Sequence, residues 1–276
     1  MKKMKYQAFR IIAGWLLLVM VSVNVFAQSK TEKLLLKKNF YLLYLLEQGG
    51  IKPAGQSCES LGKRLREDAK KAVATCGEAA CFSNAVQFKE EEIDAVGKEL
   101  SMQSLKPVWK KLIGQLKASG AYSLFAADPD SAFIRKVWQQ DATGVNYILA
   151  TYVEGRSPIY PKIDSISFAK NDTKFRGEMA NSIFRQLPKR NVPFYNIPLH
   201  LALDALQVNG RDEAIRYEPL TAGENAAAFK KAATLKWSDY KYSMILVPGL
   251  GPETPGVRLD SNGAKRCDSA VVRYRA

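Results

Sequence analysis

Apolar residues recur at three- and four-residue spacing through most of the chain, and this pattern predicts a series of amphipathic helices. Ser29 and Glu32 form a capping box ahead of an apolar run that continues to Leu46, where Gly49-Gly50 ends the helix. Apolar stripes predict three further helices, which run from Cys58 to Cys76, from Phe82 to Leu100, and from Pro107 to just before Gly120.

The next predicted helix opens at Asp128-Pro129 and has a stripe of buried residues from Phe133 to Trp138. Further helices are expected near residues 144–153, 174–187 and 197–208. We therefore expect residues 28–235 to form a helical domain.

The pattern changes near the end of the chain. The segment from Tyr242 to Val247 is apolar and β-branched, a Pro-Gly turn follows, and a basic helix is predicted from Asn262 to Ala276. A buried strand, a glycine turn and a helix open a nucleotide-binding-type domain. The predicted fold class is thus mainly α: a helical N-terminal region, then the first βα unit of an incomplete Rossmann-like α/β domain over residues 236–276. Because a parallel strand needs neighbours on both edges, we expect the rest of this domain to be missing.

Residues 1–27 have the three parts of a secretory signal peptide. Four basic residues precede an apolar stretch over residues 11–26, and small residues stand at Val25 and Ala27. We expect cleavage before Gln28 and a periplasmic or envelope-associated protein. The alternative is an uncleaved anchor, but the apolar stretch of about 16 residues is short against the ~20 that a membrane-spanning helix needs.

The chain carries a net charge of +14, and removal of the leader with its four basic residues leaves +10. An exported protein this basic is expected to meet an anionic envelope component, such as lipid phosphates, polyanionic glycans or a phosphate-bearing precursor. Export argues against nucleic acid as the partner. The alternative is a solvated basic surface without a dedicated partner, and the sequence assigns no oligomeric state.

Four cysteines in an exported chain permit disulfides. Cys58 and Cys76 lie on one predicted helix at a distance of about 27 Å, which is too far for a bond. Cys76 and Cys81 flank a short turn and are the favoured pair. This leaves Cys58 and Cys267 free, buried, or paired across the domains.

No catalytic set is recognisable, so the sequence assigns no catalytic residue. His200 is the only histidine and Asp204 follows one helical turn later, but no Gly-x-Ser-x-Gly elbow supplies a serine. A local pair on one helix is the expected role of these two residues. With one histidine and no zinc spacing, we predict no metal site.

The predicted ligand site is the turn after the C-terminal strand. Gly249 and Gly251 would let the backbone approach a ligand, and Arg258 would add positive charge for a phosphate or carboxylate. The alternative is a structural turn between strand and helix.

The same residues carry a resemblance to a family. The segment from Tyr242 to Glu253, then Arg258-Leu259, then the helix ending in Tyr274-Arg275-Ala276, resembles the start of the YdcF-like family, which includes the SanA and ElyC envelope proteins. The resemblance covers only about the last 35 residues, and the family's turn is usually Leu-Gly-Gly-Gly. It implies a Rossmann-like fold and a role in cell-envelope or cell-wall biogenesis, with S-adenosylmethionine as a cofactor of some members.

Two classes of function follow. The first is an exported YdcF-like envelope protein that binds a ligand at the glycine turn, with no reaction assigned by the sequence. The second is a non-catalytic helical binding or scaffold module of the periplasm.

Overall fold

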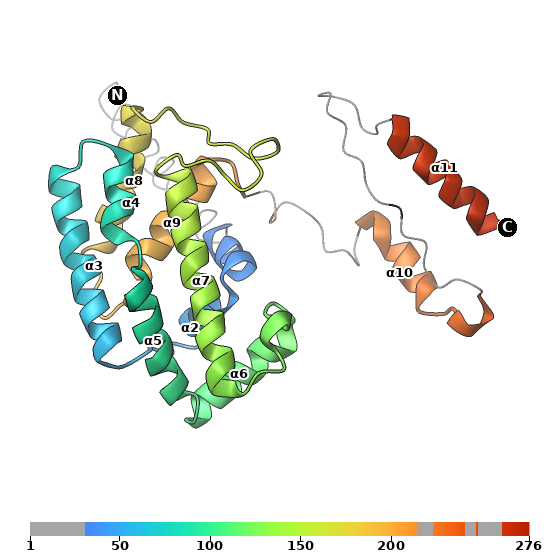
Figure 1. Ribbon diagram of the computed structural model, residues 1–276, viewed down its shortest axis with the longest axis horizontal. Helices are drawn as coiled ribbons and strands as arrows, with labels where there is room; N and C mark the ends of the chain where they lie inside the picture. The colour runs from blue at the N-terminus through green and yellow to red at the C-terminus, as the bar shows by residue number, and fades with distance from the viewer. Residues whose placement is uncertain (1–30, 213–214, 216–222, 241–246, 248–260, 276) are drawn as a thin grey trace, which may run out of the picture. The chain divides into compact units, whose positions relative to one another are not determined.

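The computed structural model describes residues 31–212, 215, 223–240, 247 and 261–275. The chain divides into two compact units, Met1–Tyr217 and Glu218–Ala276 (Figure 1). The hydrophobic pattern placed the boundary of the helical domain near residue 235.

The first unit is a helical domain around one hydrophobic core. Residues 31–39 are helical, and after them come α2 (Tyr41–Gln48), α3 (Gln56–Thr75), α4 (Ala79–Val86), α5 (Glu90–Gln103), α6 (Pro107–Ser119), η1 (Ser123–Phe125), α7 (Asp130–Tyr152), α8 (Thr173–Gln186) and α9 (Asn196–Val208). The largest side chains that are fully buried in this core are Trp109, Trp138, Tyr195, Phe82 and Phe133.

Helix α7 is the central element of the domain. It packs against both α5 and α9 and runs the length of the helical domain (Figure 1). Trp138 on α7 is 1% exposed, makes edge-to-face contacts with Phe88 and Phe194, and donates its indole N–H to the carbonyl oxygen of Ile93 at 2.9 Å. One side chain therefore joins α7 to α5 and to the segment before α9.

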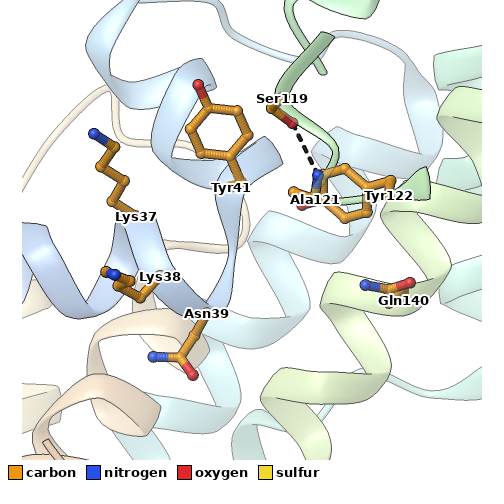
Figure 2. A pocket seen from close by; sticks show the side chains of 8 residues that line it. All are labelled: Lys37, Lys38, Asn39, Tyr41, Ser119, Ala121, Tyr122 and Gln140. Atoms are coloured by element: carbon orange, nitrogen blue, oxygen red, sulfur yellow. Dashed lines mark hydrogen bonds between the residues drawn. The ribbon is translucent and has the colours of Figure 1, made fainter. Parts of the chain in front are cut away.

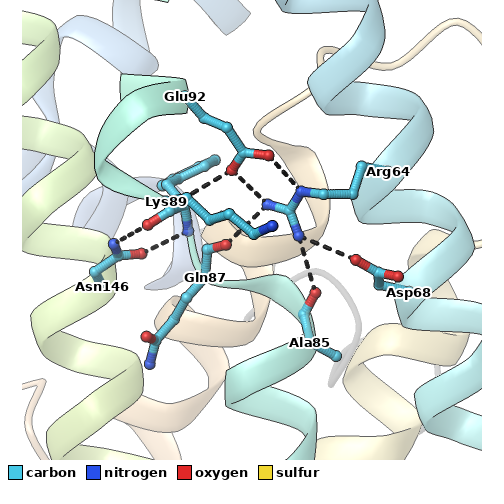
Figure 3. Close-up of polar contacts among 8 residues, drawn as sticks. Arg64, Asp68, Ala85, Gln87, Lys89, Glu92 and Asn146 are labelled. Atoms are coloured by element: carbon cyan, nitrogen blue, oxygen red, sulfur yellow. Dashed lines mark hydrogen bonds and ion pairs between the residues drawn. The ribbon is translucent and has the colours of Figure 1, made fainter. Parts of the chain in front are cut away.

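The helix expected over residues 82–100 is in fact two helices, because residues 87–89 are not helical and interrupt it. Asn146 on α7 accepts from the backbone N–H of Phe88 at 2.9 Å and donates to the carbonyl oxygen of Phe88 at 2.7 Å. Arg64 on α3 donates to the carbonyl oxygen of Gln87 at 2.9 Å (Figure 3). Side chains from two other helices thus replace the lost helical hydrogen bonds, which is why the break is tolerated.

The same guanidinium group of Arg64 pairs with Glu92 in a two-pronged geometry, at 2.5 Å from Nε and 2.7 Å from Nη2 (Figure 3). It also donates to Asp68 at 3.1 Å. Only about a fifth of either side chain in the Arg64–Glu92 pair is exposed, at 21% and 18%. Arg64 therefore fastens α3 to the break between α4 and α5.

Replacing Arg64 with lysine is expected to lower the free energy of unfolding by about 1–3 kcal/mol, because an ammonium group cannot make the forked pair and also reach Gln87. Urea unfolding followed by circular dichroism would measure the loss. The control is Lys98→Ala, which breaks a solvent-exposed pair with Asp94 and should cost less than about 0.5 kcal/mol. Equal losses in the two variants would contradict the role given to Arg64.

The second unit contains η3 (Gly223–Asn225), α10 (Ala226–Ala232), η4 (Trp237–Asp239) and α11 (Ser261–Arg275). The prediction of a Rossmann-like βα unit is wrong for the part of the chain that the structure describes, since that part contains helices and no strand. The expected strand falls mainly on residues 241–246, which lie outside the described residues. The β-branched run was a local signal only, and a parallel strand requires a sheet to pair with.

Candidate anion-binding pocket

A pocket of about 500 Å³ opens in the first unit where the helix over residues 31–39 meets α2 and the end of α6. Figure 2 shows the side chains of this pocket, which come from three separate parts of the chain. The lining residues are Lys37, Lys38, Asn39, Tyr41, Ser119, Ala121, Tyr122 and Gln140. Most of them carry a hydrogen-bond donor, two carry an amine, and none carries a carboxylate.

The interruption of the helix at Phe40 forms one wall of the pocket. Phe40 has φ −138° and ψ 71°, so the helix over residues 31–39 ends there and α2 begins in a new direction. The ring of Phe40 is buried against Gly144 of α7, where a Cβ atom would lie only 3.0 Å from the ring. The absence of a side chain at Gly144 therefore gives the Phe40 ring space in the core. Lys37, Lys38 and Asn39, which precede Phe40, line the pocket.

The end of α6 forms the opposite wall. Gly120 closes the helix with φ +72°, a left-handed conformation that glycine adopts without strain. The hydroxyl of Ser119 donates to the carbonyl oxygen of Leu116 at 2.6 Å and accepts from the N–H of Ala121 at 3.2 Å (Figure 2). This turn carries the chain to Tyr122, which lines the pocket.

Tyr122 connects the pocket to a buried acid. Its hydroxyl accepts from the N–H of Leu42 in the first turn of α2 at 2.8 Å and donates to the carboxyl group of Asp141 on α7, with 2.9 Å and 3.0 Å to the two oxygens. Asp141 is 2% exposed. The acid and the phenol together satisfy the start of α2, where the break at Phe40 leaves backbone N–H groups without helical partners.

Burial raises the pKa of Asp141 to about 8, although the hydrogen bonds from Tyr122 and from the backbone of Leu43 and Leu42 oppose this rise. Burial, and next the charge of Asp141, also raise the pKa of Tyr122 above its ordinary value. Burial therefore favours the uncharged form of both groups. The wall of the pocket itself contains two lysine amines and no carboxylate.

The amine of Lys37 lies 5.9 Å from the centre of the Tyr44 ring, a distance at which a cation and an aromatic face attract each other weakly. Lys37 and Lys38 are both exposed. With the amide of Gln140 and the hydroxyl of Tyr41 also lining the pocket, the arrangement suits a ligand that carries several anionic oxygens.

The predicted local pair of His200 and Asp204 is not what the structure shows. His200 Nδ1 contacts the carboxylate of Glu32, in the helix over residues 31–39. Asp204 accepts from the hydroxyl of Ser182 at 2.5 Å and from Arg185 at 2.6 Å. Because Ser182 bonds to the acid and not to the imidazole, these residues form a link between helices and lack the geometry of a nucleophile and its base.

Cys76 and Cys81, the pair favoured from the sequence, form a disulfide with a Cα–Cα distance of 5.6 Å. Cys58 and Cys267 are outside any disulfide, the first buried and the second exposed. Burial, reinforced by Glu99, raises the pKa of Cys58, so its thiol is unreactive at neutral pH. Within the described residues, no group of three or more side chains of the metal-binding types is placed to hold an ion.

The predicted ligand residues Gly249, Gly251 and Arg258 lie outside the described residues, so the structure does not place them. Sequence reasoning also missed the pocket over Tyr122. The one local signal was the polar run Lys37-Lys38-Asn39, which interrupts an apolar stretch that we predicted to be one continuous helix.

The chain was compared with protein-family models, with curated proteins and with solved structures, and no match was found in any of the three comparisons. Among the helices that the structure describes, none is both long enough and apolar enough to cross a membrane.

Proposed function

We propose that this chain is an exported, non-catalytic helical binding module whose pocket over Tyr122 holds a phosphate-bearing component of the cell envelope. Export rests on the leader over residues 1–27. The nature of the ligand rests on the pocket.

The observation that carries the proposal is the composition of the pocket wall. Lys37 and Lys38 supply two positive charges, and the side chains around them supply neutral donors and acceptors. Hydrogen bonds from charged amines to phosphate oxygens are roughly twice as strong as neutral ones. Burial raises the pKa of the acid behind Tyr122, Asp141, to about 8, which favours its uncharged form.

Binding without catalysis is favoured over an enzyme by the arrangement of the reactive side chains. His200 contacts Glu32, and the hydroxyl of the buried Ser182 donates to Asp204. Neither residue lines the pocket. The resemblance of residues 242–276 to the YdcF-like family stays a prediction and supports only the envelope setting of the proposal. It does not bear on the pocket, which lies in residues 37–140.

Calorimetric titration with inorganic pyrophosphate at constant ionic strength tests the proposal. The protein is the chain that begins at Gln28, the form that export is expected to leave. We expect Lys37→Ala/Lys38→Ala to weaken binding by about ten- to a hundredfold, because two charge-assisted contacts are lost.

The matched control is Lys70→Ala/Lys71→Ala, which removes the same charge from two exposed, adjacent lysines of α3. It should bind within about twofold of the unchanged protein, because neither lysine lines the pocket and exposed charges that do not contact a ligand are weakened by solvent and salt. Equal weakening in both variants would show that pyrophosphate responds only to net charge, and the proposed site would be wrong.

A further inference from the structure

An apolar, lysine-rich corner lies at the connection between α5 and α6, at the opposite end of α6 from Ser119 of the pocket. We define the basic corner as Met102, Leu105, Lys106, Val108, Lys110 and Lys111. Its three apolar side chains are largely exposed, at 68% for Met102, 76% for Leu105 and 49% for Val108. Large apolar side chains exposed together commonly mark an interaction surface.

The charged residues of the basic corner are all lysines. The connection and α6, over residues 104–119, contain four lysines and no acidic residue. Lys106, Lys110 and Lys111 are exposed, whereas the fourth, Lys117, is paired with Asp130. The closest acid before the connection is Glu99, and its carboxylate accepts from the backbone N–H groups of Ser57 and Cys58 at 2.6 Å and 3.1 Å.

The basic corner lies at one end of the helical domain, a position from which it could contact a flat surface. The connection from α5 to α6 forms one end of the first unit, and Figure 1 shows it at the lower edge of the helical domain. The inner side of α6 is fixed by Trp109, Leu112, Ile113 and Leu116, which are buried in the core. The exposed apolar side chains therefore project from a firmly packed support.

We propose that the basic corner docks on an anionic lipid bilayer. Met102, Leu105 and Val108 would enter the boundary between headgroups and acyl chains, while Lys106, Lys110 and Lys111 meet the lipid phosphates. Charge complementarity favours this occupant, since three exposed apolar side chains and three exposed lysines lie close together in the sequence, in a segment without acidic residues, and this combination matches an anionic membrane. The inference is independent of the pocket and extends the proposed function, because it would hold the pocket close to a membrane.

Sedimentation with lipid vesicles tests the inference, again with the chain that begins at Gln28, because the apolar leader would itself bind lipid. We expect binding to vesicles of equal parts phosphatidylglycerol and phosphatidylcholine, and much weaker binding to phosphatidylcholine alone. Met102→Ser/Leu105→Ser should reduce the partition coefficient by about tenfold or more. The control Leu124→Ser/Ile163→Ser, at side chains that are 89% and 81% exposed elsewhere, should change it by less than about twofold.

A second variant, Leu105→Trp, reports insertion directly. We expect its added fluorescence to be quenched by vesicles that contain brominated phosphatidylglycerol. Absence of quenching, equal binding to both kinds of vesicle, or equal losses in the two serine variants would overturn the inference. Met102→Ser/Leu105→Ser should bind pyrophosphate as the unchanged protein does, so failure at the pocket and failure at the corner are distinguishable.

Discussion

Replacement of Trp138 with alanine is expected to lower the free energy of unfolding by about 3–5 kcal/mol, the range for a large aromatic side chain removed from a packed core. Trp138 is 1% exposed and lies in edge-to-face contact with Phe88 and Phe194, with ring centres 5.5 Å and 5.3 Å away. The substitution leaves a cavity between α7, α5 and the start of α9. It also leaves the carbonyl oxygen of Ile93 without the indole donor at 2.9 Å. Urea unfolding followed by circular dichroism would measure the loss.

The variant Trp138→Phe separates packing from hydrogen bonding. Phenylalanine keeps an aromatic ring in the core but has no N–H for Ile93, so it should cost less than alanine, by about 1–3 kcal/mol in total. A loss below about 1 kcal/mol for Trp138→Ala would mean that the site collapses easily. Helix α7 would then not be the central packing element that we describe.

Replacement of Asp141 with asparagine is expected to change how stability depends on pH. The pKa of Asp141 is raised to about 8 in the folded protein, chiefly by burial. The folded state therefore holds this proton more tightly than the unfolded state does. The stability that the proton contributes is fully present below the ordinary pKa of an aspartate and is lost as the pH rises towards about 8. Asparagine does not titrate and nearly matches aspartate in shape, so the variant lacks this loss.

Unfolding free energies of the two proteins, measured between about pH 5 and pH 8, would isolate this contribution. The stability of the variant relative to the unchanged protein should rise with pH by on the order of 1 kcal/mol per unit. Glu47 and Asp204, whose pKa values are raised by burial, are present in both proteins and cancel in the comparison. The same holds for Glu32, whose pKa is lowered by His200 against the effect of burial. A constant difference would mean that Asp141 is already ionised at pH 5.

Local sequence signals predicted the individual helices but not all of their ends. Pro107 and Gly120 marked both ends of α6 correctly, because a first-turn proline and a left-handed glycine act through their own backbone conformations. The break at residues 87–89 was missed because it depends on Arg64 and Asn146, which come from other helices. Conversely, separate helices were expected on either side of Gly144, yet α7 runs through it, and the missing side chain makes room for Phe40.

The pocket could not be predicted for a similar reason. Its inner wall rests on the hydrogen bond from Leu42 to Tyr122, which joins residues 80 positions apart. Nothing in the sequence around Lys37 shows that α6 ends opposite it. The prediction fell instead on the glycine turn near the C-terminal end, because a β-branched run precedes it. Such a run shows only that a strand would be locally favourable.

The most direct test of the anion-binding pocket is an amide chemical-shift titration of the chain beginning at Gln28 with inorganic pyrophosphate at constant ionic strength. We predict that the largest shifts fall on residues 37–41 and 119–122 and on Gln140, and that they saturate together with one affinity. Shifts spread evenly over the lysines of α3 and α6, with no saturation at residues 37–41, would contradict a dedicated site and leave only a basic surface.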